Sequence, residues 1–388
     1  MEVFMGKTRR IIYVISSVMM MLMIGAVYTY SVFRPHIEIL FSLSTTLSGI
    51  PYMTSLFFYA ISMMITGRLF KVRRITFILS SGLVLIASGW MISAVSSSFT
   101  LFTMGYGVLI GIGVGMVYGV PVKAMQILYP KKSGFFTGII LLGFGLSTLI
   151  IAPVSAYFIE RLGISQTFLY FGLAYLIVLV PFILGMKLPQ DIELNVSQDD
   201  TEKKEFPISL KRIYMYFVTA TTIGLMMIGL SYTIGVKTYG FSVWHVAFSM
   251  SLFALMNGIA RPLFGFFMDK KGFKWTALLS MSLWVIASVI SIINQGTHLA
   301  LFMVSYSLYW FNLGAWLSII PATIKLKYPK EEYSKRYGDV FTGYGFGAII
   351  GTLLSGFIMD LFGETFYLYL FIGVLAIFLI VELLRSKA

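Results

Sequence analysis

Residues 254–272 read ALMNGIARPLFGFFMDKKG, an apolar run that contains Arg261 and ends in the charged turn Asp269-Lys270-Lys271-Gly272. An arginine side chain stays charged at physiological pH, and its transfer into hydrocarbon costs several kcal/mol. A cluster of lysines directly after an apolar run is typical of the cytoplasmic end of a membrane-spanning helix. The stretch therefore predicts a transmembrane helix with a charged group in its interior.

Apolar runs of this kind recur along all 388 residues, of which 58% are hydrophobic and 12% charged. Soluble domains carry about 25% charged residues, so this composition excludes an ordinary soluble protein. We predict an all-α integral membrane protein with twelve transmembrane helices. The windows that are long enough to span a bilayer lie at 9–33, 44–70, 75–95, 99–126, 134–158, 164–186, 209–236, 241–268, 275–295, 297–324, 338–361 and 364–384. The first window lacks the short core and cleavage site of a signal peptide, so we expect it to be retained.

The basic residues fix an expected orientation. If the loops alternate between the two sides of the bilayer, 25 of the 29 Lys and Arg residues fall on one side, together with both termini. By the positive-inside rule this side is cytoplasmic. We therefore expect a plasma-membrane protein with both termini in the cytoplasm. The net charge of +13 follows from this topology and requires no nucleic-acid partner.

The two groups of six spans repeat each other at a spacing of 200 residues. Pro121 corresponds to Pro321, and the glycines at 138, 143 and 145 recur at 338, 343 and 345. The charged segment KLPQDIELNVSQDDTEKKEFPI separates the two groups. We predict an N-terminal six-helix bundle at 1–186, a cytoplasmic linker at 187–208 and a C-terminal six-helix bundle at 209–388. Parallel repeats of this kind are typical of carriers whose site lies between the halves.

Several blocks of sequence resemble a known family. The loop at 265–274 is similar to a signature of the major facilitator superfamily, through Gly265, Asp269, Lys270, Gly272 and Lys274. We interpret this loop as part of a cytoplasmic gate. The blocks GAVYTYSVF (25–33), GIGVGMVYGVPV (111–122), GFFTGIILLGFG (134–145), NGIARPLFGF (257–266) and YGDVFTGYGFGAIIG (337–351) resemble the oxalate/formate antiporter family, which is related to the monocarboxylate transporters. The resemblance implies transport of small carboxylates, with the arginine on span 8 as the main anion ligand.

Arg261 is the candidate anion ligand on physical grounds as well. It lies eight residues before Asp269, hence about 12 Å from the cytoplasmic end of its helix at 1.5 Å per residue. No acidic residue is predicted near the middle of the membrane, so a substrate carboxylate is the expected counter-ion. Snorkelling and a structural ion pair are the alternatives. Asn257, four residues earlier, shares the helix face and orients the guanidinium or binds the substrate.

Asn257 and Tyr344 narrow the expected chemistry. An amide cannot titrate, so Asn257 favours exchange or facilitated diffusion over proton coupling. Tyr344 occupies the position at which the dicarboxylate antiporters of the resembled family have a lysine, and this favours a substrate with one carboxylate. Lys123 is the remaining candidate for a second cation, but it lies near the cytoplasmic end of span 4, where a snorkelling lysine is the favoured interpretation. The family resemblance implies aromatic residues in the pocket, and the expected ones are Tyr28, Tyr118, Trp310, Phe341 and Tyr344.

Other classes of chemistry find no support in the sequence. The chain has no cysteine, its three histidines lack metal-ligand spacing, and it has no phosphate-binding loop of the Walker type. We expect no enzyme activity, no cofactor and no metal. The expected function is alternating-access transport of small monocarboxylates, such as lactate, pyruvate or formate, by a monomeric exchanger or uniporter. A proton-coupled symporter, a carrier of an uncharged sugar or drug, and a sensor on a transporter fold remain the alternatives.

Overall fold

The computed structural model describes residues 6–69, 72–129, 133–186 and 208–385, and helices dominate all four ranges. Ten of these helices are long and apolar enough to cross a membrane. In hydrocarbon a helix satisfies all its own backbone hydrogen bonds, which is why apolar segments of this length adopt it. Two further helices bring the number of spans to the predicted twelve.

The first is hidden in α11 (Val243–Asn294), which has 52 residues, whereas about 20 residues span a bilayer. Gly272 interrupts it with φ 71° and ψ −178°, a backbone conformation that favours glycine, so α11 consists of two spans joined by a turn. The second is α12 (Leu299–Lys327), whose 29 residues are long enough but include buried polar residues such as Ser305 and Asn312. With these two, the described residues contain the twelve predicted spans.

The first six spans contain several short irregular segments. Span 1 consists of α1 (Lys7–Ile24), the 3₁₀ segment η1 (Gly25–Thr29) and α2 (Tyr30–Phe41). Spans 2 and 3 are α3 (Thr45–Ser48) with α4 (Ile50–Leu69), and η2 (Val72–Arg74) with α5 (Ile75–Ala94). Span 4 consists of α6 (Phe99–Phe102), the π-helical segment η3 (Thr103–Leu109) and α7 (Ile110–Leu128). Spans 5 and 6 are α8 (Ser133–Leu162) and α9 (Ile164–Gly185).

The last six spans are more regular. Span 7 is α10 (Leu210–Thr233) followed by the π-helical segment η6 (Ile234–Thr238), and spans 8 and 9 are the two arms of α11. Spans 10 to 12 are α12, α13 (Lys330–Phe362) and α14 (Thr365–Arg385). Mid-membrane departures from α-helix frequently mark functional positions. η1 is such a departure, since it contains Tyr28, one of the predicted pocket residues.

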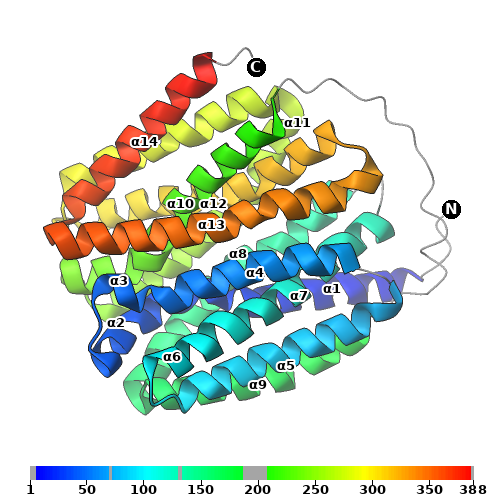
Figure 1. The fold of residues 1–388 in the computed structure, drawn as a ribbon, viewed down its shortest axis with the longest axis horizontal. Coiled ribbons are helices and arrows are strands. Elements are labelled where there is room, and N and C mark those ends of the chain that lie inside the picture. Colours follow the sequence, from blue (N-terminus) through cyan, green and yellow to red (C-terminus); the bar gives the residue numbers. More distant parts are fainter. Residues whose placement is uncertain (1–5, 70–71, 130–132, 187–207, 386–388) are drawn as a thin grey trace.

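The helices form two groups that lie side by side in Figure 1, with α1–α9 in the lower part and α10–α14 in the upper part. We call them the first half and the second half. They meet where α8 packs on α11, where α4 packs on α13 and where α2 packs on α10. The contact between α8 and α11 requires glycine, because a Cβ atom at Gly145 would lie 2.9 Å from Cα of Gly258. The repeated glycines of the sequence therefore include one at the interface of the halves.

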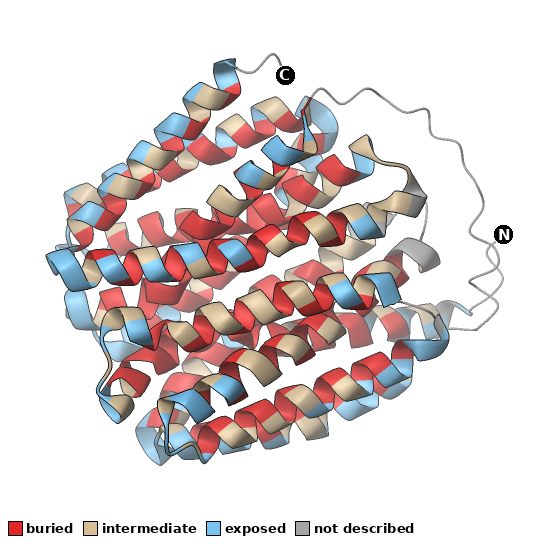
Figure 2. Ribbon diagram, in the orientation of Figure 1, coloured by how far each residue is buried: buried red, intermediate tan, exposed pale blue. Residues whose placement is uncertain are grey.

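Burial distinguishes the inner faces of the helices from their outer faces. Figure 2 shows buried residues along the inner faces of the helices and exposed residues on their outer faces. Large apolar side chains such as Phe77 and Ile177 are among the exposed ones, at 72% and 74%. An outer surface of this composition suits lipid and not water. The predicted bundle bounds, 1–186 and 209–388, stay predictions, and the predicted linker at 187–208 lies outside the described residues except for Ile208.

Candidate functional site

Arg261 lies between the two halves and is almost completely buried, with 1% of its surface exposed. Its Nη1 donates to the backbone oxygen of Leu141 on α8, in the opposite half, at 2.7 Å. Its Nη2 donates to Oδ1 of Asn257, one turn earlier on α11, at 3.2 Å. Its Nε makes no hydrogen bond to the described residues, and no carboxylate among them forms an ion pair with Arg261. The guanidinium thus has an unused Nε–H donor and no described carboxylate partner in a buried site.

Asn257 is held in place from its other side. Its Nδ2 donates to the backbone oxygen of Trp310 on α12 at 2.7 Å, so the amide is fixed with its oxygen toward Arg261. The indole Nε1 of Trp310 in turn donates to the hydroxyl of Ser231 on α10 at 2.9 Å. Three helices of the second half thus fix Asn257, while Leu141 of the first half accepts from the other side of the guanidinium.

The five aromatic residues that the sequence predicted for the pocket gather around Arg261. Tyr28, Tyr118, Trp310, Phe341 and Tyr344 are all at most 1% exposed. The hydroxyl of Tyr344 donates to the hydroxyl of Tyr28 across the interface of the halves at 2.6 Å. The rings of Tyr28 and Trp310 are in edge contact at 6.2 Å, and those of Phe341 and Tyr344 stack at 5.1 Å. Together with Arg261 and Asn257, all seven predicted pocket residues lie in one cluster.

Two aromatic residues that the sequence did not single out complete this cluster. Phe144 on α8 lies under the guanidinium, with Cζ of Arg261 5.7 Å from its ring centre. Tyr59 on α4 contacts the rings of Tyr118, Phe341 and Tyr344 at 5.2, 5.5 and 5.6 Å. Among 63 aromatic residues, neither carries a local sequence signal that separates it from core residues. The site is therefore one cation surrounded by aromatic rings and hydroxyl groups.

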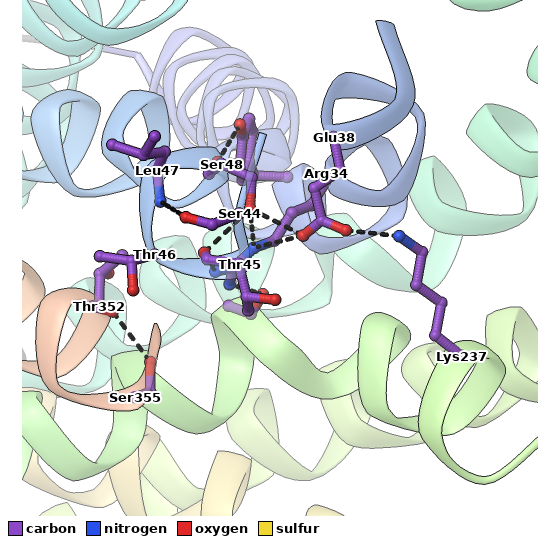
Figure 3. A network of polar contacts seen from close by, with 12 residues as sticks. Arg34, Glu38, Ser44, Thr45, Thr46, Leu47, Ser48, Lys237, Thr352 and Ser355 are labelled. Atoms are coloured by element: carbon purple, nitrogen blue, oxygen red, sulfur yellow. Dashed lines mark hydrogen bonds and ion pairs between the residues drawn. The ribbon is translucent and has the colours of Figure 1, made fainter. Parts of the chain in front are cut away.

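Charged residues close the bundle at the end where α2 and α3 meet the second half (Figure 3). Arg34 on α2 is 1% exposed and donates to the Ser48 hydroxyl at 3.0 Å and to the backbone oxygen of Gly229 on α10 at 3.1 Å. Glu38, one turn further along α2, accepts from Ser48 at 2.7 Å and forms an ion pair with Lys237 of the second half. Each of these two charged residues of the first half is thus bound to the second half.

A further contact joins the halves at this same end. The carboxylate of Asp360 on α13 accepts from the backbone N–H groups of Thr45 and Thr46 at 3.1 and 3.0 Å. These N–H groups are at the N-terminus of α3, where a helix favours a negative charge. We call Arg34, Glu38, Lys237 and Asp360 the charged seal. The sequence placed its members near span ends but gave no sign that they contact one another.

The other end of the bundle, where the lysine-rich loops lie, is joined by an ion pair between Arg68 on α4 and Asp339 on α13. The predicted gate residues take no part in this ion pair. Gly272 forms the turn of α11, Asp269 and Lys270 are exposed, and Lys270 lies 4.5 Å from the ring centre of Phe266 on its own helix.

Gly265 faces open space, and none of the four predicted gate residues forms a described hydrogen bond or ion pair to the first half. Their role as a gate stays a prediction. A shallow surface opening lined by Phe267, Lys271 and Trp275 lies at the same loop, outside the cluster around Arg261. Described contacts thus join the halves at both ends of the bundle, and the predicted pocket residues between these ends are buried.

The comparisons with known proteins agree with this architecture. The sequence matches the family described as Major Facilitator Superfamily over residues 14–272 and 214–387. It is 24% identical over 350 residues to the protein named "Uncharacterized MFS-type transporter YhjX" of Escherichia coli (strain K12), covering 84% of this chain and 82% of that protein. It is 24% identical over 294 residues to the "Oxalate:formate antiporter" of Oxalobacter formigenes, covering 72% and 68%.

A solved structure has the same fold. It is the crystal structure of a bacterial homolog of the human lysosomal transporter Spinster, in an inward-facing and occupied conformation. The likeness has a TM-score of 0.70 with 14% sequence identity, and covers 98% of this chain and 96% of that one.

Proposed function

The chain belongs to the major facilitator superfamily and is a membrane transporter of the oxalate/formate antiporter type, not an enzyme, and we propose that it carries small monocarboxylates by alternating access. The observation that carries this proposal is Arg261, a buried cation with an unused Nε donor and no carboxylate partner among the described residues. A buried charge needs a counter-charge, and a carboxylate matches the planar geometry of a guanidinium. The substrate supplies that carboxylate.

A single carboxylate is favoured over two because of the charges nearby. Arg34 is the other arginine that is buried in the described part of the chain, but it already has Glu38 at 3.6 Å and three oxygen acceptors. Tyr344 offers a hydroxyl and no charge at the position where the related antiporters have a lysine. Neither Arg34 nor Tyr344 therefore offers a free counter-ion to a second carboxylate beside Arg261, and burying that carboxylate unpaired would cost several kcal/mol.

Exchange is the favoured mode of transport. When the substrate is bound, the occluded site is electrically neutral, whereas an empty occluded site contains the unpaired charge of Arg261. This difference raises the free energy of the occluded state of the empty carrier, so the empty carrier changes sides more slowly than the loaded one. Asn257 cannot take up a proton, which argues against proton coupling at this position.

The proposed orientation places the lysine-rich loops, the Arg68–Asp339 ion pair and both termini in the cytoplasm, and the charged seal on the outer side of the plasma membrane. The excess of Lys and Arg at one set of span ends supports it. In this orientation opening toward the outside separates Lys237 from Glu38, and opening toward the cytoplasm separates Arg68 from Asp339. A monomer contains the complete proposed site.

The proposed function is tested by counterflow of labelled acetate in proteoliposomes, with and without a pH gradient. We expect Arg261→Ala to abolish uptake, and Arg261→Lys to retain a small part of it because a lysine keeps the charge but loses the two-pronged geometry. Arg336→Ala, which removes an exposed arginine paired with Glu332 in its own helix, is the control and should be nearly neutral. Wild-type uptake by the Arg261→Ala protein would disprove the assignment.

A further inference from the structure

Thr148 lies on the face of α8 that points into the site. The backbone oxygen of Leu141 and the ring of Phe144 both contact Arg261, and Thr148 follows them by seven and four residues. Residues at spacings of four and seven share one face of a helix. The neighbouring Ser147 points elsewhere, because its Cβ lies only 2.7 Å from the position that a Cβ atom at Gly25 of span 1 would occupy.

The Thr148 hydroxyl is completely buried and makes no hydrogen bond to the described residues. Some buried hydroxyls in this chain bind the backbone oxygen one turn earlier, as Ser231 and Thr323 do at 2.7 Å, whereas others, including the adjacent Ser147, are unpaired like Thr148. Leaving a buried hydroxyl unpaired costs about 1–3 kcal/mol. Arg261 Nε, which belongs to the same site, is also unpaired. The site therefore offers two kinds of unused polar group, one charged and one neutral.

Thr148 follows the part of α8 that contacts Arg261. Thr148 is four residues beyond Phe144, hence about 6 Å along the α8 axis. Helical side chains tilt toward the N-terminus of their helix, so the Thr148 side chain leans in the direction of Phe144. A threonine hydroxyl both donates and accepts hydrogen bonds, which suits a hydroxyl as well as a keto oxygen.

We infer that Thr148 is a specificity-determining residue, whose hydroxyl binds the oxygen on carbon 2 of a 2-hydroxy or 2-oxo monocarboxylate while Arg261 binds the carboxylate. This inference rests on the proposed function and deepens it, because Arg261 by itself accepts any small carboxylate. Acids with an oxygen on carbon 2 gain a hydrogen bond that acids without it lack, and a site with an unused polar group discriminates strongly in their favour.

The test uses three acids with the same carbon skeleton. Propionate, lactate and pyruvate compete with labelled acetate for uptake into proteoliposomes that contain the full-length protein. We expect lactate and pyruvate to inhibit the wild-type protein at lower concentrations than propionate. In Thr148→Val, which keeps the shape and removes the hydroxyl, this preference should fall about tenfold while acetate uptake persists.

Two further variants separate the hydroxyl from packing effects. Thr148→Ser keeps the hydroxyl and should retain the preference, whereas Ser147→Ala removes the adjacent hydroxyl, which points to span 1, and should leave the preference unchanged. An unchanged preference in Thr148→Val would overturn the inference. Loss of acetate uptake in both Thr148 variants would also overturn it, since Thr148 would then act through packing. Full acetate uptake by Arg261→Ala would instead refute the proposed function.

Discussion

Replacement of Asn257 by aspartate places a competing anion next to the proposed ligand of the substrate. Oδ1 of Asn257 already accepts from Nη2 of Arg261 at 3.2 Å, and the side chain is completely buried. Aspartate is nearly isosteric with asparagine, so the change adds a negative charge with little change in shape. An ionised aspartate at this position would neutralise Arg261 internally and repel the carboxylate of the substrate.

The size of the effect follows from the distance. Two unit charges 3.2 Å apart interact with about 5 kcal/mol at an effective dielectric constant of about 20. Removal of the new carboxylate from water opposes this attraction, as does loss of the hydrogen bond from Nδ2 to Trp310. We therefore expect a smaller net effect, an approximately 100-fold loss of apparent substrate affinity at neutral pH, or about 2.7 kcal/mol.

Protonation of the new carboxyl group removes the competing charge, so binding of the substrate becomes linked to binding of a proton. By linkage, the apparent affinity of Asn257→Asp should rise as the pH falls. The assay is acetate counterflow between pH 5 and pH 8, followed by uptake driven by an inward proton gradient. The wild-type protein should respond little to that gradient, whereas the variant should accumulate acetate.

Asn312→Asp is the matched control. Asn312 is also completely buried in the second half, but its Oδ1 accepts from Ser280 and not from Arg261. This variant tests whether any new buried carboxylate impairs transport. If both variants lose affinity equally, or if Asn257→Asp transports acetate like the wild type at every pH, then Asn257 does not control the charge of Arg261 and the reasoning is wrong.

Two further substitutions test the charge count and the seal. Tyr344→Lys adds a cation beside Tyr28, which can pair with the second carboxylate of oxalate. Oxalate should then inhibit acetate uptake at a concentration at least about tenfold lower than in the wild type. An unchanged inhibitory concentration would contradict the single-cation argument. Lys237→Ala removes the ion pair between Glu38 and the second half. We expect the outer side to open more often, so a cysteine placed at buried Thr233 should become accessible from outside. In Lys237→Ala this cysteine should react several-fold faster with an impermeant thiol reagent added outside than in the protein that keeps Lys237. The natural chain has no cysteine, and an unchanged labelling rate would show that this ion pair does not close the outer side.

Much of the site was predictable because the membrane makes a buried charge conspicuous. Arg261 is a charged residue within an apolar run, and the spacing of four residues places Asn257 on the same face of the helix. Their hydrogen bond and the surrounding rings of Tyr28 and Tyr344 agree with that prediction. The resemblance to a family supplied the aromatic positions, which composition could not supply in a chain with so many aromatic residues.

Contacts between the halves were not predictable in the same way. Arg34 and Glu38 look like ordinary charged residues near a span end, and only the packing of α2 against α10 shows that they bind Gly229 and Lys237. The charged turn at Gly272 was the expected gate, yet the ion pair at that end of the bundle joins Arg68 to Asp339, 271 residues apart in the sequence. Pairing over such a separation leaves no local pattern.

The sequence by itself determined that the chain crosses the membrane twelve times, because hydrocarbon requires long apolar helices and the distribution of lysine and arginine marks their ends. It also determined that one of these apolar helices contains an arginine, for which we predict a substrate anion as the counter-ion. Only the tertiary structure decided what surrounds that arginine. The backbone oxygen of Leu141 and the ring of Phe144 lie more than a hundred residues away in the sequence. They reach the site because α8 packs against α11 at Gly145 and Gly258, an approach that depends on the absence of side chains.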